Sequence, residues 1–337
     1  MSPRCVGVWQ ATLVVGLALT LGACGDGGVE SSSAPSSAPG TTDSGPTTTP
    51  STSEADSPAP TTGPPSVDLD GAAWSAVYGF GGAWIQVDPP VDQLVKVDSA
   101  SGAVTLRVDG GTSAAIAEDA VWVTVAGEET RKLDPATGAV LLSAPTPGAY
   151  YLSVGAGGVW VPADGGIVRL DPTSGASVAT IAIDADQITD LAAADDGVWV
   201  TDKVAGRVFR VDPATNQVVA EIPTGAGAHD LAIDEHAVWV TNYQANTVSR
   251  IDRTTNVITT TIEGQGSGVG IVAGGGAVWV STRDVGIARI DAASNEVVSF
   301  AELLGWNYGV AYGDGELWVS NVERGLVYRL PLDVGPS

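Results

Sequence analysis

Two aspartates and one histidine are the residues of this sequence whose types and spacing could support chemistry. His229 is followed directly by Asp230, and Asp190 occurs earlier in the chain. A histidine beside a carboxylate can exchange protons with a substrate, and two carboxylates can share a divalent cation such as Mg²⁺ or Ca²⁺. His229 is the one candidate for a catalytic group, because the only other histidine, His236, falls in a turn.

Other kinds of chemistry find little support in the composition. No set of His, Cys and carboxylate residues has the spacing of a zinc site, and no glycine-rich run leads into a helix as a phosphate-binding loop would. We therefore expect no cofactor beyond a cation at the two aspartates. Acidic residues outnumber basic ones by 39 to 15, giving a formal net charge of -24. Such a surface repels a phosphate backbone, so nucleic acid is excluded as a partner.

A further chemical signal is a cysteine placed directly after an apolar N-terminal segment. The apolar run Val6–Leu21 is followed by two small residues and Cys24. This order predicts a secretion signal over residues 1–23. The segment Leu21-Gly22-Ala23-Cys24 resembles the lipobox of bacterial lipoproteins, which implies cleavage before Cys24 and acylation of its sulfur. An ordinary cleaved signal with an incidental cysteine is the alternative.

The segment after Cys24 has the composition of a tether. Residues 24–65 are almost entirely Ser, Thr, Pro, Gly and Ala with a few acids. A segment without apolar periodicity cannot bury enough surface to fold. We expect a disordered linker that carries the rest of the chain on the extracytoplasmic side of the cell membrane.

One unit recurs from residue 66 to the end of the chain and positions all the candidate residues except Cys24. Its mark is a tryptophan flanked by apolar, mostly β-branched residues and followed by a small polar one. The tryptophans are 38 to 40 residues apart, and the seven copies are Trp84, Trp122, Trp160, Trp199, Trp239, Trp279 and Trp318. A period of about 40 residues is typical of solenoids and propellers.

Each unit predicts four short antiparallel strands. In the fifth copy they are Asp230–Ile233, Val238–Thr241, Val248–Ile251 and Val257–Ile262. Turns such as Asp134-Pro135-Ala136-Thr137-Gly138 join the third strand to the fourth, with proline presetting φ and glycine taking the left-handed position. Seven four-stranded units predict an all-β, seven-bladed β-propeller over residues 66–337. A linear solenoid is the structural alternative.

The two ends of the repeat region predict that the ring is closed. The last unit stops at Ser337 after three strands, whereas counting back from Trp84 by the repeat spacing places a fourth-strand segment at Val67. We expect the N-terminal strand to complete the last blade and so remove the open edges of the array.

Residues present in every unit most simply serve what every unit needs. We therefore expect the seven tryptophans to pack blade against blade. A basic residue also recurs on each third strand and is expected to pair with nearby acids or carbonyl groups; these residues are Lys96, Lys132, Arg169, Arg210, Arg250, Arg289 and Arg329.

Function should lie where the repeat is broken. Loops that lead into the innermost strands open on one face of a propeller, together with the loops between second and third strands. Aromatic and charged residues gather at these positions and predict the mouth of a ligand site: Trp74, Tyr150, Tyr151, Asp190, His229, Asp230, Tyr243 and Tyr308. Adjacent strand residues such as His229 and Asp230 are expected to point to opposite faces. The alternative is that large side chains merely plug the channel.

The unit resembles the YVTN and NHL-like propeller repeats, and within them the streptogramin lyase-like group. Val238-Trp239-Val240-Thr241-Asn242 and Ser249-Arg250-Ile251-Asp252 carry this resemblance best. It implies the propeller fold and, as an activity, a metal-assisted elimination that uses histidine and glutamate on neighbouring blades. The segment Gly227-Ala228-His229-Asp230 resembles that group's histidine motif, while Val269 and Gly270 fill the matching positions of the next blade.

Three functions remain open from the sequence. The first is a cell-envelope lipoprotein whose propeller binds a small molecule, a peptide or an envelope protein at the channel mouth. The second is a metal-assisted lyase or hydrolase acting at the same mouth, with His229 as its candidate residue. The third is a scaffold for envelope proteins that uses the rim of the ring.

Overall fold

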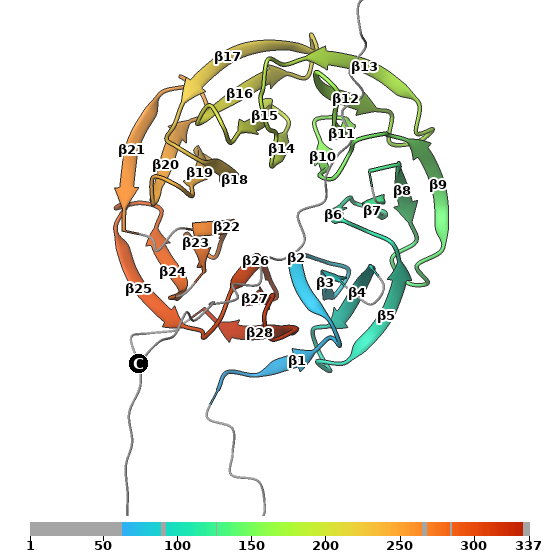
Figure 1. The fold of residues 1–337 in the computed structure, drawn as a ribbon, viewed down its shortest axis with the longest axis vertical. Helices are drawn as coiled ribbons and strands as arrows, with labels where there is room; N and C mark the ends of the chain where they lie inside the picture. The colour runs from blue at the N-terminus through green and yellow to red at the C-terminus, as the bar shows by residue number, and fades with distance from the viewer. Residues whose placement is uncertain (1–62, 89–91, 126, 265–267, 284, 333–337) are drawn as a thin grey trace, which may run out of the picture. The chain divides into compact units, whose positions relative to one another are not determined.

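A computed structural model describes residues 63–88, 92–125, 127–264, 268–283 and 285–332. Seven four-stranded antiparallel sheets are arranged in a ring, with one edge strand of each sheet nearest the centre (Figure 1). The fold is therefore the seven-bladed β-propeller that the repeat predicts. In the described ranges no helix is long and apolar enough to cross a membrane. The predicted signal, Cys24 and the tether up to residue 62 lie outside the described residues.

Four concentric sets of strands build the blades. The innermost set is β2 (Ala72–Gly79), β6 (Ser113–Ile116), β10 (Ser153–Gly155), β14 (Leu191–Ala194), β18 (Ala228–Ile233), β22 (Gly268–Gly274) and β26 (Asn307–Gly313). The second set, which carries the motif tryptophans, is β3 (Gly82–Asp88), β7 (Val121–Val125), β11 (Gly158–Ala163), β15 (Gly197–Asp202), β19 (Ala237–Asn242), β23 (Ala277–Thr282) and β27 (Glu316–Asn321).

The two outer sets complete each sheet. The third set is β4 (Gln93–Asp98), β8 (Glu129–Leu133), β12 (Gly166–Leu170), β16 (Arg207–Asp212), β20 (Thr247–Asp252), β24 (Gly286–Asp291) and β28 (Leu326–Pro331). The outermost set is β5 (Val104–Asp109), β9 (Val140–Pro145), β13 (Ser177–Ala182), β17 (Gln217–Pro223), β21 (Ile258–Glu263), β25 (Val297–Glu302) and β1 (Ser66–Asp68). We number the blades 1 to 7 from the sheet that begins with β2.

The N-terminal strand closes the ring as predicted. In the seventh sheet the strand order is β1-β28-β27-β26, and Val67 lies opposite Val327. Backbone bonds extend the pairing on both sides, from the Leu69 N–H to the Gly325 carbonyl and from the Arg329 N–H to the Pro65 carbonyl. This closure excludes the linear solenoid.

The motif tryptophans join neighbouring blades. Trp84, for example, is fully buried in a cluster with Val121 and Val123 of the second blade, and Trp318 lies in the corresponding cluster with Ala83 and Ile85 of the first blade. The same arrangement recurs at every junction between blades. The expected structural role of the tryptophans is confirmed, and the junction at Trp318 closes the ring.

The repeated basic residues lie over these tryptophans. In each blade the cationic group is 4.8–5.6 Å or, for Lys132, 5.9 Å from the centre of its own blade's tryptophan ring. A cation over an indole face is attracted by the ring quadrupole. Several also donate to carbonyl groups of the next blade, as Arg169 Nη1 does to Pro213 O at 2.7 Å. The predicted carbonyl pairing is present, and the stacking adds to it.

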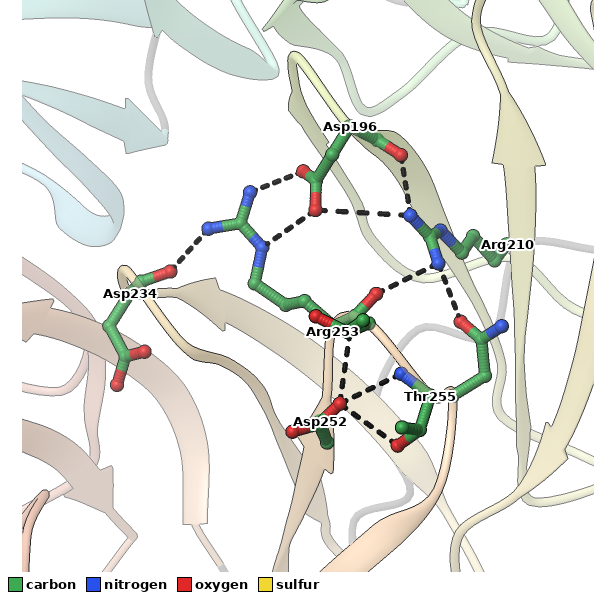
Figure 2. A network of polar contacts seen from close by, with 8 residues as sticks. Asp196, Arg210, Asp234, Asp252, Arg253 and Thr255 are labelled. Carbon is green, nitrogen blue, oxygen red and sulfur yellow. Dashed lines mark hydrogen bonds and ion pairs between the residues drawn. The ribbon is translucent and has the colours of Figure 1, made fainter.

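Figure 2 shows how such contacts continue across the fourth and fifth blades, on the face opposite the predicted mouth. Arg210 donates to the Arg253 carbonyl at 2.8 Å. Arg253 in turn donates to the Asp196 carboxylate and to the Asp234 carbonyl. Asp196 and Asp234 lie in turns between first and second strands, and Arg253 lies in a turn between a third and a fourth strand. The network therefore stabilises the face opposite the mouth and not the mouth itself.

Candidate functional site

A cavity of about 430 Å³ lies on the axis of the ring, enclosed by residues of all seven innermost strands or the loops before them. Its polar lining forms a belt where the chain enters those strands: Ser75, Ser113, Tyr151, Thr189, Asp190, His229, Asp230 and Tyr308. Beyond the belt the lining is mainly apolar, as expected for strand residues that face one another across a closed ring. The cavity has the volume of a small-molecule site.

The structure brings most of the sequence-predicted mouth residues together. Tyr151, Asp190, His229, Asp230 and Tyr308 line the cavity. Trp74 and Tyr243 stand beside it: the Trp74 ring is 5.3 Å from that of Tyr308, and the Tyr243 ring is 6.3 Å from that of His229. Tyr150 is 52% exposed and lies outside the cavity lining.

The loops that the sequence places on one face do meet there. The Tyr243 N–H, from the turn between second and third strands, donates to the Gly227 carbonyl at 2.9 Å. Equivalent bonds run from the Lys203 N–H to the Gln187 carbonyl and from the Val322 N–H to the Trp306 carbonyl. The fourth, fifth and seventh blades thus each carry their two mouth loops as a connected pair.

His229 and Asp230 lie at an irregularity in the innermost strand of the fifth blade. Both are among the residues that line the cavity. The pairing of β18 with β19 shifts register between Ala228 and Leu231, so regular alternation is interrupted at these two positions. A bulge re-aims side chains in this way and is common beside functional sites.

Asp190 and Asp230 form a pair of carboxyl groups across neighbouring blades. The two side chains lie close enough to interact, and a hydrogen bond between them favours the protonated form of Asp190. Asp190 Oδ2 also accepts the Leu231 N–H at 2.8 Å, and Asp230 Oδ2 accepts the Ile271 N–H at 3.2 Å. Burial raises the pKa of Asp190 well above its usual value, and the charge of Asp230 raises it further. Asp190 therefore keeps its proton to higher pH than an ordinary aspartate.

Three aromatic rings form the wall next to this pair. Trp74, Trp306 and Tyr308 are in mutual edge-on contact, with ring centres 5.3, 5.3 and 6.1 Å apart. The Arg283 guanidinium lies 4.8 Å from the centre of the Trp306 ring. Trp306 is not among the residues predicted from the sequence, because it lies two residues before Tyr308 and outside the two repeat positions compared between blades. The sequence feature that distinguishes it is that this tryptophan does not belong to the motif series.

Polar atoms of this wall lack partners. Trp74 Nε1, Trp306 Nε1 and His229 Nδ1 are buried and have no hydrogen-bond partner among the described residues. Burial lowers the pKa of His229, so its imidazole is neutral at pH 7. An unsatisfied buried polar group costs about 1–3 kcal/mol. The buried motif tryptophans Trp122, Trp199 and Trp318 also have an unpaired indole nitrogen, so only Nδ1 of His229, a residue of the cavity lining, indicates a ligand.

Hydroxyl groups two residues after the motif tryptophans fix the backbone of the mouth. Thr241 Oγ1 accepts the Asp230 N–H at 3.1 Å and donates to the Val269 carbonyl of the next blade at 3.4 Å. Ser281 in the sixth blade likewise donates to the Tyr308 carbonyl. The small polar residue of the repeat motif therefore positions the site, and the sequence contained this signal.

Replacing Asp190 by asparagine is expected to alter how stability depends on pH. The folded pKa of Asp190 is raised, so between the unfolded and folded values the native state binds more protons and wild-type stability falls as pH rises. Asparagine keeps an acceptor for the Leu231 N–H and donates to Asp230 without titrating. The variant should gain on the wild type by at most about 1.4 kcal/mol per pH unit through this window.

Urea unfolding at several pH values between about 4 and 8 measures this difference. Asp164→Asn, an exposed change of the same kind on the same face, is the control and should show no such trend. A variant that is less stable than the wild type by the same amount at every pH would contradict the assignment.

The residues present fit a divalent cation poorly. Over the described ranges no group of three or more His, Cys, Asp or Glu side chains could hold a metal ion. Each aspartate of the pair already uses one oxygen for a backbone N–H. Since Ca²⁺ takes six to eight oxygen ligands and Mg²⁺ demands an octahedron, the two remaining oxygens make an incomplete site.

Comparisons with known proteins agree on the fold. No protein-family model matches the chain, and no curated protein matches its sequence. Solved structures do match: a streptogramin B lyase has a TM-score of 0.67 at 17% identity, covering 80% of this chain and 97% of its own. The WD40 domain of Pan2 from Neurospora crassa has a TM-score of 0.66 at 11% identity, covering 78% and 94%.

A third match is the β-propeller domain of Cps50 (Swd1) from Myceliophteria thermophila, with a TM-score of 0.66 at 12% identity. It covers 80% of this chain and 100% of its own. At identities this low the similarity concerns the propeller fold.

Proposed function

We propose that this propeller is a binding module that holds a small amphipathic ligand at the mouth of its axial channel. The observation that carries the proposal is an axial cavity of about 430 Å³, whose lining combines the polar groups of Tyr151, Asp190, His229, Asp230 and Tyr308 with mainly apolar strand residues. Pockets of this kind, mostly apolar with a few convergent polar groups, are the usual seats of small molecules.

The alternative, that the large side chains merely plug the channel, accounts less well for this cavity. A plug gains its stability from packing and satisfied hydrogen bonds. Here about 430 Å³ stays unfilled, and Nδ1 of His229, a residue of the lining, has no hydrogen-bond partner among the described residues. These features favour a site prepared for a partner.

We further propose that the module works at the cell envelope, anchored by a lipid on Cys24. The support is the segment Leu21-Gly22-Ala23-Cys24 after an apolar run, together with the placement of the only other cysteine, Cys5, inside the predicted signal. Two acyl chains make a lasting anchor where one does not.

Intrinsic fluorescence can test the binding proposal. Trp74 and Trp306 are the described tryptophans outside the buried motif series, so a ligand at the mouth should change emission chiefly through them. We expect saturable changes when the full chain is titrated with octylamine, octanoate or octanol. For each ligand that binds, Trp306→Ala should raise the dissociation constant by at least about tenfold, as expected for an aromatic anchor.

Leu304→Ala is the matched control, because Leu304 is 71% exposed in the same loop as Trp306. It should leave the dissociation constant within about twofold. Binding that survives Trp306→Ala unchanged, or a wild type that responds to no member of the panel, would refute the proposal.

A lyase remains the second candidate, on one observation. His229 is neutral, its Nδ1 carries no partner and it faces the same cavity as Asp230, which is how a general base is prepared. The fold similarity to a streptogramin B lyase agrees with this alternative at the level of architecture. Turnover of a cyclic depsipeptide that His229→Ala abolishes would favour it over binding alone.

A further inference from the structure

We propose that the ligand of the channel is an organic cation with an apolar tail, whose ammonium group binds between Asp190 and Asp230. This inference rests on the proposed binding function and specifies the chemistry of the ligand. It is drawn from the charge of the lining, the free oxygens of the pair, and the order of polar and apolar residues along the channel.

The charge of the lining favours a cation. Asp190 and Asp230 are the only acidic side chains among the residues that line the cavity, and no lysine or arginine lines it. The basic residues nearby belong to the loops of the mouth face. Arg283 lies over the Trp306 ring, and the positive charge of Lys203 contributes to the lowered pKa of His229. A ring of low-dielectric walls around two carboxyl groups concentrates a negative potential on the axis.

The hydrogen bonds of the pair leave room for an ammonium group. Through one oxygen, each carboxyl group accepts a hydrogen bond from a backbone N–H of the next blade, and the pair can share one proton. An ammonium carries three N–H donors and can bond to both carboxylates at once. On binding, the proton between the carboxyl groups leaves to solvent and the ligand's own charge replaces it.

Aromatic groups complete the surroundings of a cation. Tyr151, Tyr308 and His229 line the cavity at the level of the pair. Burial raises the pKa of both tyrosines, and the nearby charges of the two aspartates raise it further. Faces of aromatic rings attract organic cations, which a hydrated metal ion cannot exploit as well. The residues thus suit an alkylammonium better than Mg²⁺ or Ca²⁺.

The rest of the channel suits an apolar tail. Directly after the polar belt each innermost strand contributes an apolar residue to the lining: Ala76, Ala114, Leu152, Leu191, Leu231, Ile271 and Val310. Further along come Ile116 and Val154, and then Tyr78 and Tyr312 near the opposite face. Burial of a methylene group contributes to binding without any specific contact, so the tail sets affinity and the ammonium sets selectivity.

Isothermal titration of the full chain with three ligands of equal tail length tests the inference. Octylamine carries the cation, octanoate an anion and octanol no charge. We expect octylammonium to bind at least about tenfold more tightly than octanol and octanoate, because charge-assisted hydrogen bonds are the strong ones. Titrations in buffers of different ionisation enthalpy should show about one proton released per ligand bound.

Variants of the pair give the residue-level test. Asp190→Asn and Asp230→Asn should each weaken octylammonium at least about tenfold and leave octanol within about twofold. Asp164→Asn, exposed on the same face, should change neither. Octylammonium affinity should rise with pH as Asp190 loses its proton, with His229, Tyr151, Tyr308 and Lys203 as the other titratable groups around the pair.

The possible failures are distinguishable. If octanol or octanoate binds as tightly as octylammonium and Trp306→Ala abolishes that binding, the inference is wrong and the proposed function stands. If none of the three binds, both are wrong. If Mg²⁺ or Ca²⁺ alone raises the melting temperature of the wild type but not of Asp190→Asn, the pair is a metal site and the inference is overturned.

Discussion

Replacing Trp318 by alanine is expected to lower the free energy of unfolding by about 3–5 kcal/mol. Trp318 is fully buried and packs against Ala83, Ile85 and Val95 of the first blade. Its ring also lies 4.8 Å from the Arg329 guanidinium, which loses this contact in the variant. The space left by the removed indole ring lies at the junction between the seventh and first blades. The closed ring holds both blades there, so neighbouring residues cannot move in to fill that space.

Urea unfolding of the full chain measures the loss, with Val257→Ala as control because Val257 is 56% exposed. The control should stay within about 0.5 kcal/mol of the wild type. A loss below about 1 kcal/mol for Trp318→Ala would show that the junction between seventh and first blades contributes little, contrary to the packing described above.

Replacing Cys24 by serine is expected to release the protein from the membrane. Serine cannot accept the thioether-linked diacylglycerol, and once the signal over residues 1–23 is removed the tether offers no apolar run that could hold the chain instead. We expect the wild type to enter the detergent phase on Triton X-114 partitioning and the variant to remain in the aqueous phase, an almost complete shift.

Cys5→Ser is the matched control, because Cys5 lies in the segment that the predicted cleavage removes. It should partition as the wild type does, and mass spectrometry should find a lipid mass on the peptide that begins at residue 24. Equal partitioning of Cys24→Ser and the wild type would contradict the lipoprotein proposal and leave the channel site untouched.

Much of the fold could be predicted because the sequence pattern of each strand recurs in seven repeat units. The four strands expected in the fifth copy lie within two residues of β18, β19, β20 and β21 at each end. The closing strand at Val67 followed from counting alone. Local spacing and tertiary packing favour the same structure in every blade, and such agreement makes a fold predictable from its sequence.

The site was predictable only in part, because it is made where the repeat is broken. Comparison of two repeat positions between blades found His229 and Tyr308 but passed over Trp306, which lies two residues earlier. The register shift at His229 and Asp230 in β18 is not revealed by alternation of the sequence. Bulges depend on pairing with the neighbouring strand, so they are set by tertiary structure more than by local pattern.

The repeated basic residues illustrate a different limit. Their recurrence indicated a structural role, and carbonyl groups were the expected partners. Stacking of Arg210 on Trp199 or of Arg329 on Trp318 required knowing that residues opposite each other on paired strands share a face. With that register in hand, the cation–ring pair in each blade follows from the sequence directly.

A crystal structure of the full chain with bound octylammonium is the strongest test of the proposed cation site. We expect the ligand's nitrogen within about 3.2 Å of carboxylate oxygens of both Asp190 and Asp230, and its alkyl chain on the axis beside Leu191 and Leu231. A ligand found only on the outer surface of the ring, or one lying in the channel with its nitrogen away from both aspartates, would contradict it.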